Sequence, residues 1–329
     1  VGSYAIHHKC VSEVHITGSE KSHDAIVWGT DDQATERKSC GKPLLDKPIT
    51  SELGNVSPWI VVPGKYSGRE LRFQAENVTA SIVNNASFNC VATKMVITAR
   101  NWPQRKQFLD LIDQSLQNAP TRFAYYPGSQ NRFERFAGTN ALGANDGKLP
   151  WTFLRETDPV RTPHLFQEES FVCVCGETTL DSETATEFLK NAVAFVNESM
   201  WGTLCVTITL PGQFARSDSG GVDQAIADLN YANIGINHWP ALIYALMSPP
   251  WGGAGATLED VQSGIGYVHN TSFLKNIQKT VLRGPLTLFP KPIWFASHRN
   301  PVPVAWQLFE LYKRKSVHSL PGLFWRALQ

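Results

Sequence analysis

The sequence has 329 residues, of which 42% are hydrophobic, so the chain can bury a large core in one large or two unequal domains. Its 30 Lys and Arg residues and 29 Asp and Glu residues give a net charge of +1, which provides no general attraction to nucleic acid or to a membrane surface. No apolar run approaches the roughly 18 residues of a membrane span, no signal-peptide pattern is present, and six cysteines do not suggest a disulfide scaffold. We therefore expect a cytoplasmic protein with no nucleic-acid or membrane partner.

The first 53 residues predict a strand, a tight turn, a short helix and then a loop. Val11 to Ile16 alternates loosely between apolar and polar residues and ends at Thr17-Gly18-Ser19. A short helix is predicted through Ala25 to Trp28. Residues 31–47 are rich in charged residues and in residues that interrupt regular structure, so we expect a surface loop there.

Residues 54–280 alternate between strand and helix patterns. Ser67-Gly-Arg-Glu70 has the form of a capping box, and the apolar residues from Leu71 to Ala86 then recur on one face of a helix. Continuous apolar strands that alternate with helices predict an α/β fold with a three-layer arrangement, a parallel sheet covered on both faces. Further strands are predicted at 94–98, 171–175, 204–210 and 234–236, further helices at 108–116, 188–196 and 222–229, and irregular structure at 120–165.

Cys90 lies on the connection between the predicted helix and the strand at 94–98, a place where functional side chains often lie. A free cysteine at such a place is alternatively a small buried hydrophobe. What favours a functional role is the company of two earlier segments: Thr17-Gly18-Ser19, and Glu52-Leu-Gly-Asn55 directly before Ser57-Pro58.

In this order, the segments resemble the aldehyde dehydrogenase superfamily, whose members carry Thr-Gly-Ser, then Glu-Leu-Gly-Gly before Ser-Pro, then Gly-Gln-x-Cys with the nucleophile. Glu169-Ser-Phe171 looks like the Glu-x-Phe-Gly-Pro segment of this family, and Asn197 to Gly202 resembles its Asn-x-x-x-x-Gly-Leu segment. Ile234 to Asn237 and Pro250-Trp-Gly-Gly253 look like its final Gly-x-x-x-Asn and Pro-Phe-Gly-Gly pair. The resemblance implies three parts: residues 1–53 as the remnant of an NAD(P)-binding domain, 54–280 as the catalytic domain, and 281–329 as a C-terminal arm.

The resemblance also implies a reaction, the NAD(P)-dependent oxidation of an aldehyde to a carboxylic acid through a cysteine thiohemiacetal and a thioester. It makes Cys90 the nucleophile, a role that suits a thiolate, and Glu52 the base that activates water. From the residues alone, Glu52 is otherwise a cap or ion-pair partner at a strand end, and Phe171 is otherwise a core residue. The expected cofactor is NAD or NADP, and its expected contacts are Gly18, Ser19, Leu53, Gly54, Glu169 and Phe171.

The sequence departs from the family at three places: Ser87-Phe-Asn-Cys90 replaces Gly-Gln-x-Cys, Asn55 replaces a glycine, and Val172-Cys173 replaces Gly-Pro. Two family elements, an oxyanion-binding asparagine and a lysine-bearing segment at the adenosine ribose, would precede residue 1. We therefore expect the chain to be the C-terminal part of a longer protein, inactive on its own. A catalytically inactive binding or structural module and an acyl-CoA-forming relative stay open as alternatives.

Residues 281–329 contain Trp294, Trp306, Trp325 and the basic run Lys313-Arg-Lys315. One interpretation is a packing arm with a solvated charge run, and the other is a surface for anionic lipid or for a partner protein. Members of the family commonly form dimers or tetramers, so a homo-oligomer is expected as an alternative to a monomer.

No metal site is expected. The cluster of His7, His8, Cys10, His15 and His23 has no supporting C-x-x-C pair. Cys173 and Cys175 are two residues apart on a predicted strand and would point to opposite faces of it, so they are poor joint ligands.

Overall fold

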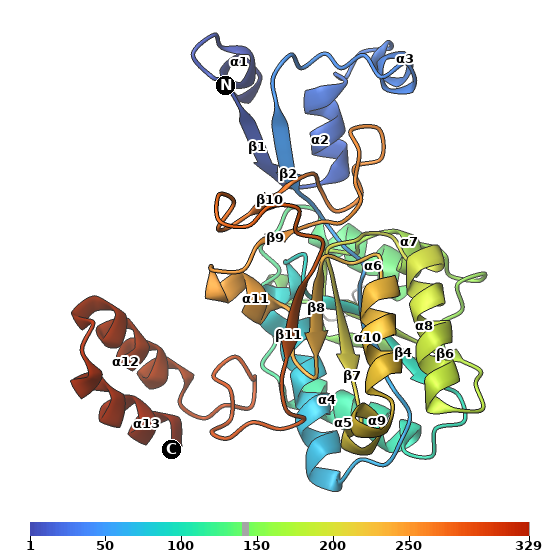
Figure 1. Cartoon of the computed structure of the whole chain (residues 1–329), viewed down its shortest axis with the longest axis vertical. Helices are drawn as coiled ribbons and strands as arrows, with labels where there is room; N and C mark the ends of the chain where they lie inside the picture. The colour runs from blue at the N-terminus through green and yellow to red at the C-terminus, as the bar shows by residue number, and fades with distance from the viewer. Residues whose placement is uncertain (140–144, 329) are drawn as a thin grey trace.

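The computed structural model describes residues 1–139 and 145–328, and its centre is a seven-stranded sheet in which every strand pair is parallel (Figure 1). The chain enters the sheet at β3, adds strands on one side, and then crosses back to add the rest on the other side. The strands, in their order across the sheet, are β11 (Thr280–Arg283), β8 (Asn233–Ile236), β7 (Cys205–Thr209), β3 (Ser57–Val61), β4 (Thr93–Ala99), β6 (Val174–Leu180) and β5 (Thr152–Leu154).

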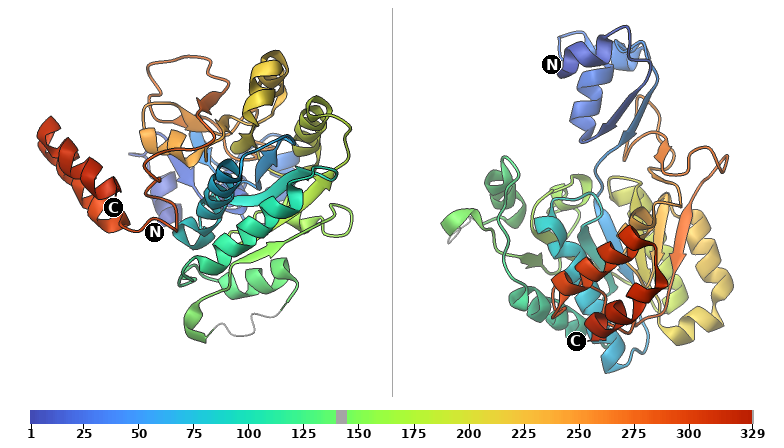
Figure 2. Two further views of the ribbon diagram at one scale, coloured as in Figure 1. Left: turned by 90° about the horizontal axis from the view of Figure 1, so that it is seen from below. Right: turned by 90° about the vertical axis from the view of Figure 1, so that its left-hand side faces the viewer.

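Helices cover both faces of this sheet, so the predicted three-layer α/β class is confirmed. Helices α4 (Gly68–Val83) and α5 (Arg105–Asn118) lie on one face, and α8 (Ala185–Ser199) and α10 (Ser219–Asp228) lie on the other (Figures 1 and 2). Shorter helices surround them: α6 (Ser129–Ala137), α7 (His164–Gln167), α9 (Gly212–Ser217) and α11 (Ala241–Leu246), with 3-10 turns η1 (Asn84–Ser87) and η2 (Asn145–Gly147).

The N-terminal residues form a small unit at one end of the molecule (Figure 1). Its two-stranded parallel sheet pairs β1 (Val14–Thr17) with β2 (Ile49–Glu52), so that Thr17 lies opposite Glu52. A ribbon of β9 (Trp251–Gly252) and β10 (Tyr267–Val268) lies between this unit and the main sheet. The helices of the unit are α1 (Gly2–His7), α2 (Glu20–Val27) and α3 (Ala34–Ser39).

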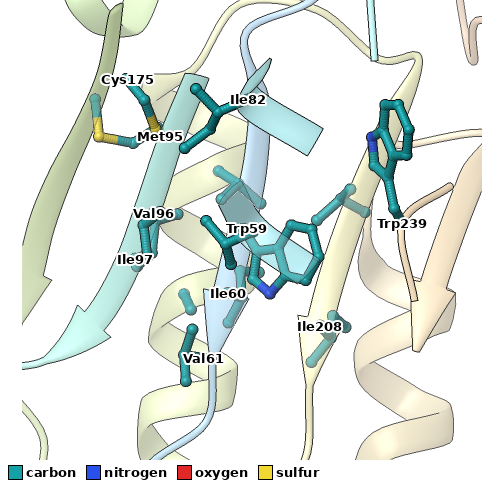
Figure 3. Close-up of a cluster of buried hydrophobic side chains, with 14 of the residues drawn as sticks. Trp59, Ile60, Val61, Ile82, Met95, Val96, Ile97, Cys175, Ile208 and Trp239 are labelled. Carbon is teal, nitrogen blue, oxygen red and sulfur yellow. The ribbon is translucent and has the colours of Figure 1, made fainter. Parts of the chain in front are cut away.

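The central strand β3 is apolar on both of its faces because helices cover both faces of the sheet. Trp59, Ile60 and Val61 have at most 1% of their surface exposed, and they pack beside β4 and β7 (Figure 3). Replacing such a side chain by alanine typically costs about 2–5 kcal/mol, because a cavity is left in addition to the lost burial. This core fixes the strand ends that carry the candidate site.

Helix α4 begins where its sequence signals a start. The Ser67 side chain accepts a hydrogen bond from the Glu70 backbone N–H, and the Glu70 carboxylate accepts one from the Ser67 backbone N–H. This confirms the capping box. Leu71, Val78 and Ile82 are then buried on the face that the apolar spacing predicts.

The chain ends in a helical hairpin that projects away from the sheet (Figures 1 and 2). It consists of α12 (Pro301–Arg314), η3 (Val317–Ser319) and α13 (Leu320–Leu328). Within the described residues, no helix combines the length and the apolar character that crossing a membrane requires.

Three expectations about local structure are wrong. Residues 31–47 contain α3, where Arg37 donates to Asp31 and to the Trp28 carbonyl and so holds a polar helix against the N-terminal unit. Residues 120–165 contain α6, which buries Phe133 and Phe136 one turn apart, and also β5; residues 140–144 of that range lie outside the described part. The strand expected at 171–175 begins only at Val174, because Phe171 has a left-handed backbone (φ 42°).

Candidate active site

Three segments of the chain converge at the amino ends of the parallel strands of the main sheet. Glu52 ends β2 and leads into β3, Cys90 precedes β4, and Glu169 and Phe171 precede β6. Because parallel strands that lie side by side begin at the same edge of a sheet, their preceding segments meet there. The structure therefore brings Glu52, Leu53, Gly54, Cys90, Glu169 and Phe171 to one edge.

The Cys90 thiol contacts the carboxylate of Glu52, the residue expected to be the base that activates water. Its Sγ donates to Oε1 of Glu52 over 3.9 Å. The same oxygen accepts a second hydrogen bond, 2.7 Å long, from the indole Nε1 of Trp251. Cys90 is half-buried and Glu52 is buried, so a candidate nucleophile and a candidate base lie together in a partly dry site.

The electrostatic environment keeps Cys90 protonated. Burial raises the pKa of its thiol well above the ordinary value, and the negative charges of Glu169 and Glu52 raise it further. A thiolate is the reactive form of cysteine, so Cys90 requires an adjacent proton acceptor. Glu52 is placed to be that acceptor.

Glu169 presents an unsatisfied carboxylate to the same site. Its Oε1 is buried and has no hydrogen-bond partner among the described residues, while the Asn55 backbone N–H bonds the carboxylate. Burial raises its pKa from 4.5 to about 7, and the positive charges of Lys94 and Arg132 act in the opposite direction. A Cβ at Gly54 would overlap this carboxylate, so the glycine is required for the close approach.

Lys94 is a buried cation next to these carboxylates. Its Nζ donates to the Ser87 carbonyl, the Ser87 hydroxyl and the Val172 carbonyl, at 3.2, 2.8 and 2.9 Å. Burial lowers the pKa of Lys94, whereas the charge of Glu169 raises it. Through these bonds the lysine ties the segment before Cys90 to the segment before β6.

The turn before Cys90 has an unusual backbone. Three consecutive residues that are not glycine, Asn85, Ala86 and Ser87, have φ angles of 50°, 55° and 69°. Ser87 occupies the position of the glycine in Gly-Gln-x-Cys, so the departure from the family pattern puts a side chain where glycine would adopt this conformation without strain.

An aromatic wall flanks this turn. Phe88 contacts Tyr125, Tyr126 and Phe171 with ring centroids 5.0, 5.7 and 5.8 Å apart. The Arg132 guanidinium lies over the Tyr126 ring, 5.6 Å from its centroid. Phe171 therefore borders the site and is not solely a core residue, although its ring contacts aromatic side chains.

Gly18 and Ser19 lie at the boundary between the N-terminal unit and this edge. The Gly18 backbone N–H donates to the Glu52 carbonyl over 3.1 Å, and Ser19 caps the N-terminus of α2 by accepting from the Ser22 N–H. Leu53 is buried, and its N–H donates to the Ser263 carbonyl. The turn thus lies beside the backbone of Glu52, with the positive end of a short helix next to it.

Sequence reasoning missed four residues that contact the site. Trp251 was recognised only as part of Pro-Trp-Gly-Gly, and the signal was the tryptophan in place of phenylalanine, which adds an N–H donor. Asn55 donates to the Ser57 hydroxyl, and Ser57 donates in turn to the Cys90 carbonyl, both over 2.9 Å. Nothing in the pattern around Lys94 indicated that it would bond the segments before Cys90 and before β6, because Lys94 occupies an ordinary position in a predicted strand.

The histidine and cysteine residues do not assemble into a metal site in the part of the chain that the structure describes, where no group of three or more His, Cys, Asp or Glu side chains is placed to hold a metal ion. The side chains of Cys173 and Cys175 are both buried, and burial raises the pKa of each thiol to about 12. They therefore act as core residues at ordinary pH.

Comparison with solved structures places this fold among aldehyde dehydrogenases. The chain superposes on the NADP-dependent glyceraldehyde-3-phosphate dehydrogenase of Bacillus halodurans C-125 with a TM-score of 0.59 and 16% identity, over 82% of this chain and 51% of that one. It matches the NAD-dependent aldehyde dehydrogenase of Sinorhizobium meliloti with a TM-score of 0.60 and 15% identity, over 82% and 50%. For a putative aldehyde dehydrogenase of Burkholderia cenocepacia the values are 0.57 and 19%, over 81% and 52%.

No protein-family model matches the sequence, and no curated protein matches it either. The structural matches confirm the expected fold, a parallel sheet covered on both faces as in aldehyde dehydrogenases. The chain spans about half the length of the solved structures it matches.

Proposed function

We propose that this chain carries the nucleophile and base of an NAD(P)-dependent aldehyde dehydrogenase, which oxidises an aldehyde to a carboxylic acid. The observation that carries the proposal is the contact between the Cys90 thiol and the Glu52 carboxylate, 3.9 Å apart, inside an aldehyde dehydrogenase fold. We also propose the division into a cofactor-domain part up to residue 53, a catalytic part up to residue 280 and an arm beyond it, although strand β11 runs across the second boundary.

The residues support a two-stage use of Glu52. In the first stage Glu52 takes the proton of Cys90, and the thiolate forms a bond to the carbonyl carbon of the aldehyde. A bound nicotinamide supplies the acceptor for the hydride that leaves this carbon, and a thioester on Cys90 results. Glu52 then releases this proton to solvent. In the second stage Glu52 takes a proton from water, the hydroxide attacks the thioester, and the carbon–sulfur bond breaks to give the acid, while Glu52 returns the proton to the Cys90 thiolate.

NAD or NADP fits the residues at this edge. The buried, unpartnered Oε1 of Glu169 is an acceptor suited to a ribose hydroxyl, and the Gly54 position leaves that carboxylate close to the backbone. Gly18 and Ser19, at the N-terminus of α2, suit a phosphate. Leu53 and Phe171 would contribute the apolar contacts.

The raised pKa of Cys90 favours a second candidate, a catalytically inactive module with the same fold. A thiol that is buried beside two carboxylates is rarely ionised, and the Ser-Phe-Asn-Cys turn replaces the family pattern. Activity and thiol reactivity separate the two functions.

The test is aldehyde-dependent formation of NADH and NADPH by the complete gene product that contains this chain, with this chain alone assayed beside it. We expect Cys90→Ala to lower turnover by about a thousandfold or more. The matched control is Cys40→Ala, which removes an exposed free cysteine in the N-terminal unit and should leave turnover unchanged.

Three further results, on thiol labelling, on turnover and on coenzyme A dependence, complete the test. Iodoacetamide should label Cys90 faster than the exposed Cys10 and Cys40 if the site is catalytic. No turnover across a broad aldehyde panel, together with an unreactive Cys90, would establish the inactive module. An acyl product that forms only when coenzyme A is added would identify an acyl-CoA-forming enzyme.

A further inference from the structure

The C-terminal hairpin (residues 301–328) leaves its outer aromatic side chains in solvent. Among its described residues only Val304 is buried. An exposed patch of this composition marks an interaction site. Five aromatic residues have 52–79% of their surface exposed: Trp306, Phe309, Tyr312, Phe324 and Trp325.

Helical spacing places these residues on one side of the hairpin. In α12, Trp306, Phe309 and Tyr312 form one stripe, while the half-buried Leu308 and Leu311 face the seam with α13. In α13 the exposed stripe holds Phe324, Trp325 and Leu328, and the seam holds Leu320 and Leu323.

When each helix is viewed from its N-terminus, the exposed stripe lies about 110–140° around the helix axis from the seam. The rotation from seam to stripe has the same direction in both helices. Because α12 and α13 run antiparallel (Figure 1), that shared sense turns both stripes toward the same side. The hairpin therefore has one apolar, aromatic face.

The charge of this region contrasts with the rest of the chain. Residues 291–329 contain six of the 30 basic residues but only one of the 29 acidic ones, so their net charge is +5, whereas residues 1–290 have 24 basic and 28 acidic residues and a net charge of −4. The one acidic residue, Glu310, is paired with Arg314 at 2.7 Å and lies near Lys313 at 3.9 Å. The near-neutral net charge of the whole chain thus conceals a strongly basic C-terminal segment, residues 291–329.

We propose that this hairpin binds the surface of a bilayer that contains anionic lipids. A helix pair with Trp, Phe and Leu on one face and Lys and Arg around it lies in the plane of the interface, with the aromatic face among the acyl chains and the cations among the headgroups. The hairpin itself has four basic residues and one acidic residue, and this net charge of +3 opposes direct pairing of two hairpins, because like charges repel across an interface. This arm is thus the exception to the expectation of no membrane partner.

The experiment is co-sedimentation of the complete chain with phosphatidylcholine vesicles, with and without phosphatidylglycerol. We expect binding only to the anionic vesicles, and weaker binding as the salt concentration rises. The combined substitutions Lys313→Gln, Arg314→Gln and Lys315→Gln should weaken binding on the order of a hundredfold, because each cation near the surface contributes about 1 kcal/mol. The matched control is Arg161→Gln, Lys190→Gln and Lys275→Gln, which removes three exposed charges elsewhere and should leave binding within about twofold.

The aromatic face is tested separately. Trp306→Ser with Phe309→Ser should weaken vesicle binding at least about tenfold, whereas Phe273→Ser with Val160→Ser, which removes exposed apolar residues elsewhere, should not. All these positions are exposed, so an unchanged urea midpoint will show that each variant is folded.

Three results would overturn the proposal. The first is no sedimentation with anionic vesicles, and the second is equal binding to both kinds of vesicle. The third is a concentration-dependent oligomer, measured by light scattering, that the Trp306 and Phe309 substitutions dissolve while vesicle binding is absent. This last outcome would assign the aromatic face to a second copy of the chain.

Discussion

Two glutamates of the β6 region, eight residues apart, show opposite ways of burying a carboxylate. Glu177, within β6, is fully buried and accepts four hydrogen bonds: from the Thr98 hydroxyl at 2.6 Å, from Arg105 Nε and Nη2 at 3.0 and 2.9 Å, and from the Glu156 N–H at 3.0 Å. Glu169, just before β6, has one buried oxygen without a partner in the described structure. The first carboxylate is satisfied by the fold, and the second is left to be satisfied by something else.

The contrast separates a carboxylate that stabilises the fold, Glu177, from one that is available to a ligand, Glu169. A buried polar group that is fully hydrogen-bonded fixes the fold, while an unsatisfied one costs free energy that a ligand, an ordered water or a proton can recover. The amino end of the sheet carries the unsatisfied group, together with Cys90 and Lys94. We infer that this end is the working edge, and that the Glu177 cluster is a brace for it.

The largest effect is expected when the fully hydrogen-bonded carboxylate, Glu177, is removed. Glu177→Leu should lower the free energy of unfolding by about 3–5 kcal/mol, because the mostly buried Arg105 loses its buried counter-charge and keeps the exposed carboxylate of Glu156, 3.3 Å away. The measurement is the urea midpoint at constant slope. Asp181→Leu, which removes the exposed partner of Arg100, is the matched control and should cost about 0–1 kcal/mol. Equal losses in the two variants would contradict the idea of a brace.

The incompletely hydrogen-bonded carboxylate, Glu169, predicts that the stability of the protein depends on pH. Because the folded-state pKa of Glu169 is raised from 4.5 to about 7, the folded protein binds more protons than the unfolded chain between these values, and stability falls as pH rises through them. Glu169→Gln should remove this loss, so it should stabilise the protein at pH 8 but not at pH 4. Urea midpoints across that range test the prediction. A constant difference between the two proteins would show that the raised pKa is wrong.

The smallest effect compares two buried indoles, Trp251 of β9 and Trp59 in the middle of β3. Trp251 donates to the candidate base Glu52, whereas Trp59 donates to Thr209 over 2.8 Å, away from the site. Each change to phenylalanine should cost about 1–3 kcal/mol of stability. Only Trp251→Phe should also speed iodoacetamide labelling of Cys90, by about two- to tenfold, because Glu52 then accepts from the thiol alone. Equal labelling of the two variants would remove Trp251 from the site.

Much of this architecture could be predicted from the sequence because it depends on repeating signals. The spacing of Leu71, Val78 and Ile82, the capping box at Ser67 and the apolar strand at β4 each require only local physics. The expected roles of Glu52 and Cys90 came from a family resemblance, and local patterns alone would not have singled out these two residues. The structure now places the two side chains in contact.

What the sequence could not predict depends on contacts between distant segments. Lys94 reads as a strand residue, yet it bonds Ser87 and Val172, and Asn55 reaches Cys90 only through Ser57. Helix α3 was missed because a salt bridge, and not an apolar stripe, supports it. Such long-range polar contacts leave no periodic trace along the chain.

The turn before Cys90 has a consequence for how this sequence can change over generations. A left-handed residue other than glycine costs about 1–2 kcal/mol, so Ser87→Gly would relax the backbone but would remove the hydroxyl that binds Lys94. Neither position can be altered without affecting the other. Positions 87 and 94 should therefore covary among homologues, with glycine at 87 accompanied by a residue other than lysine at 94.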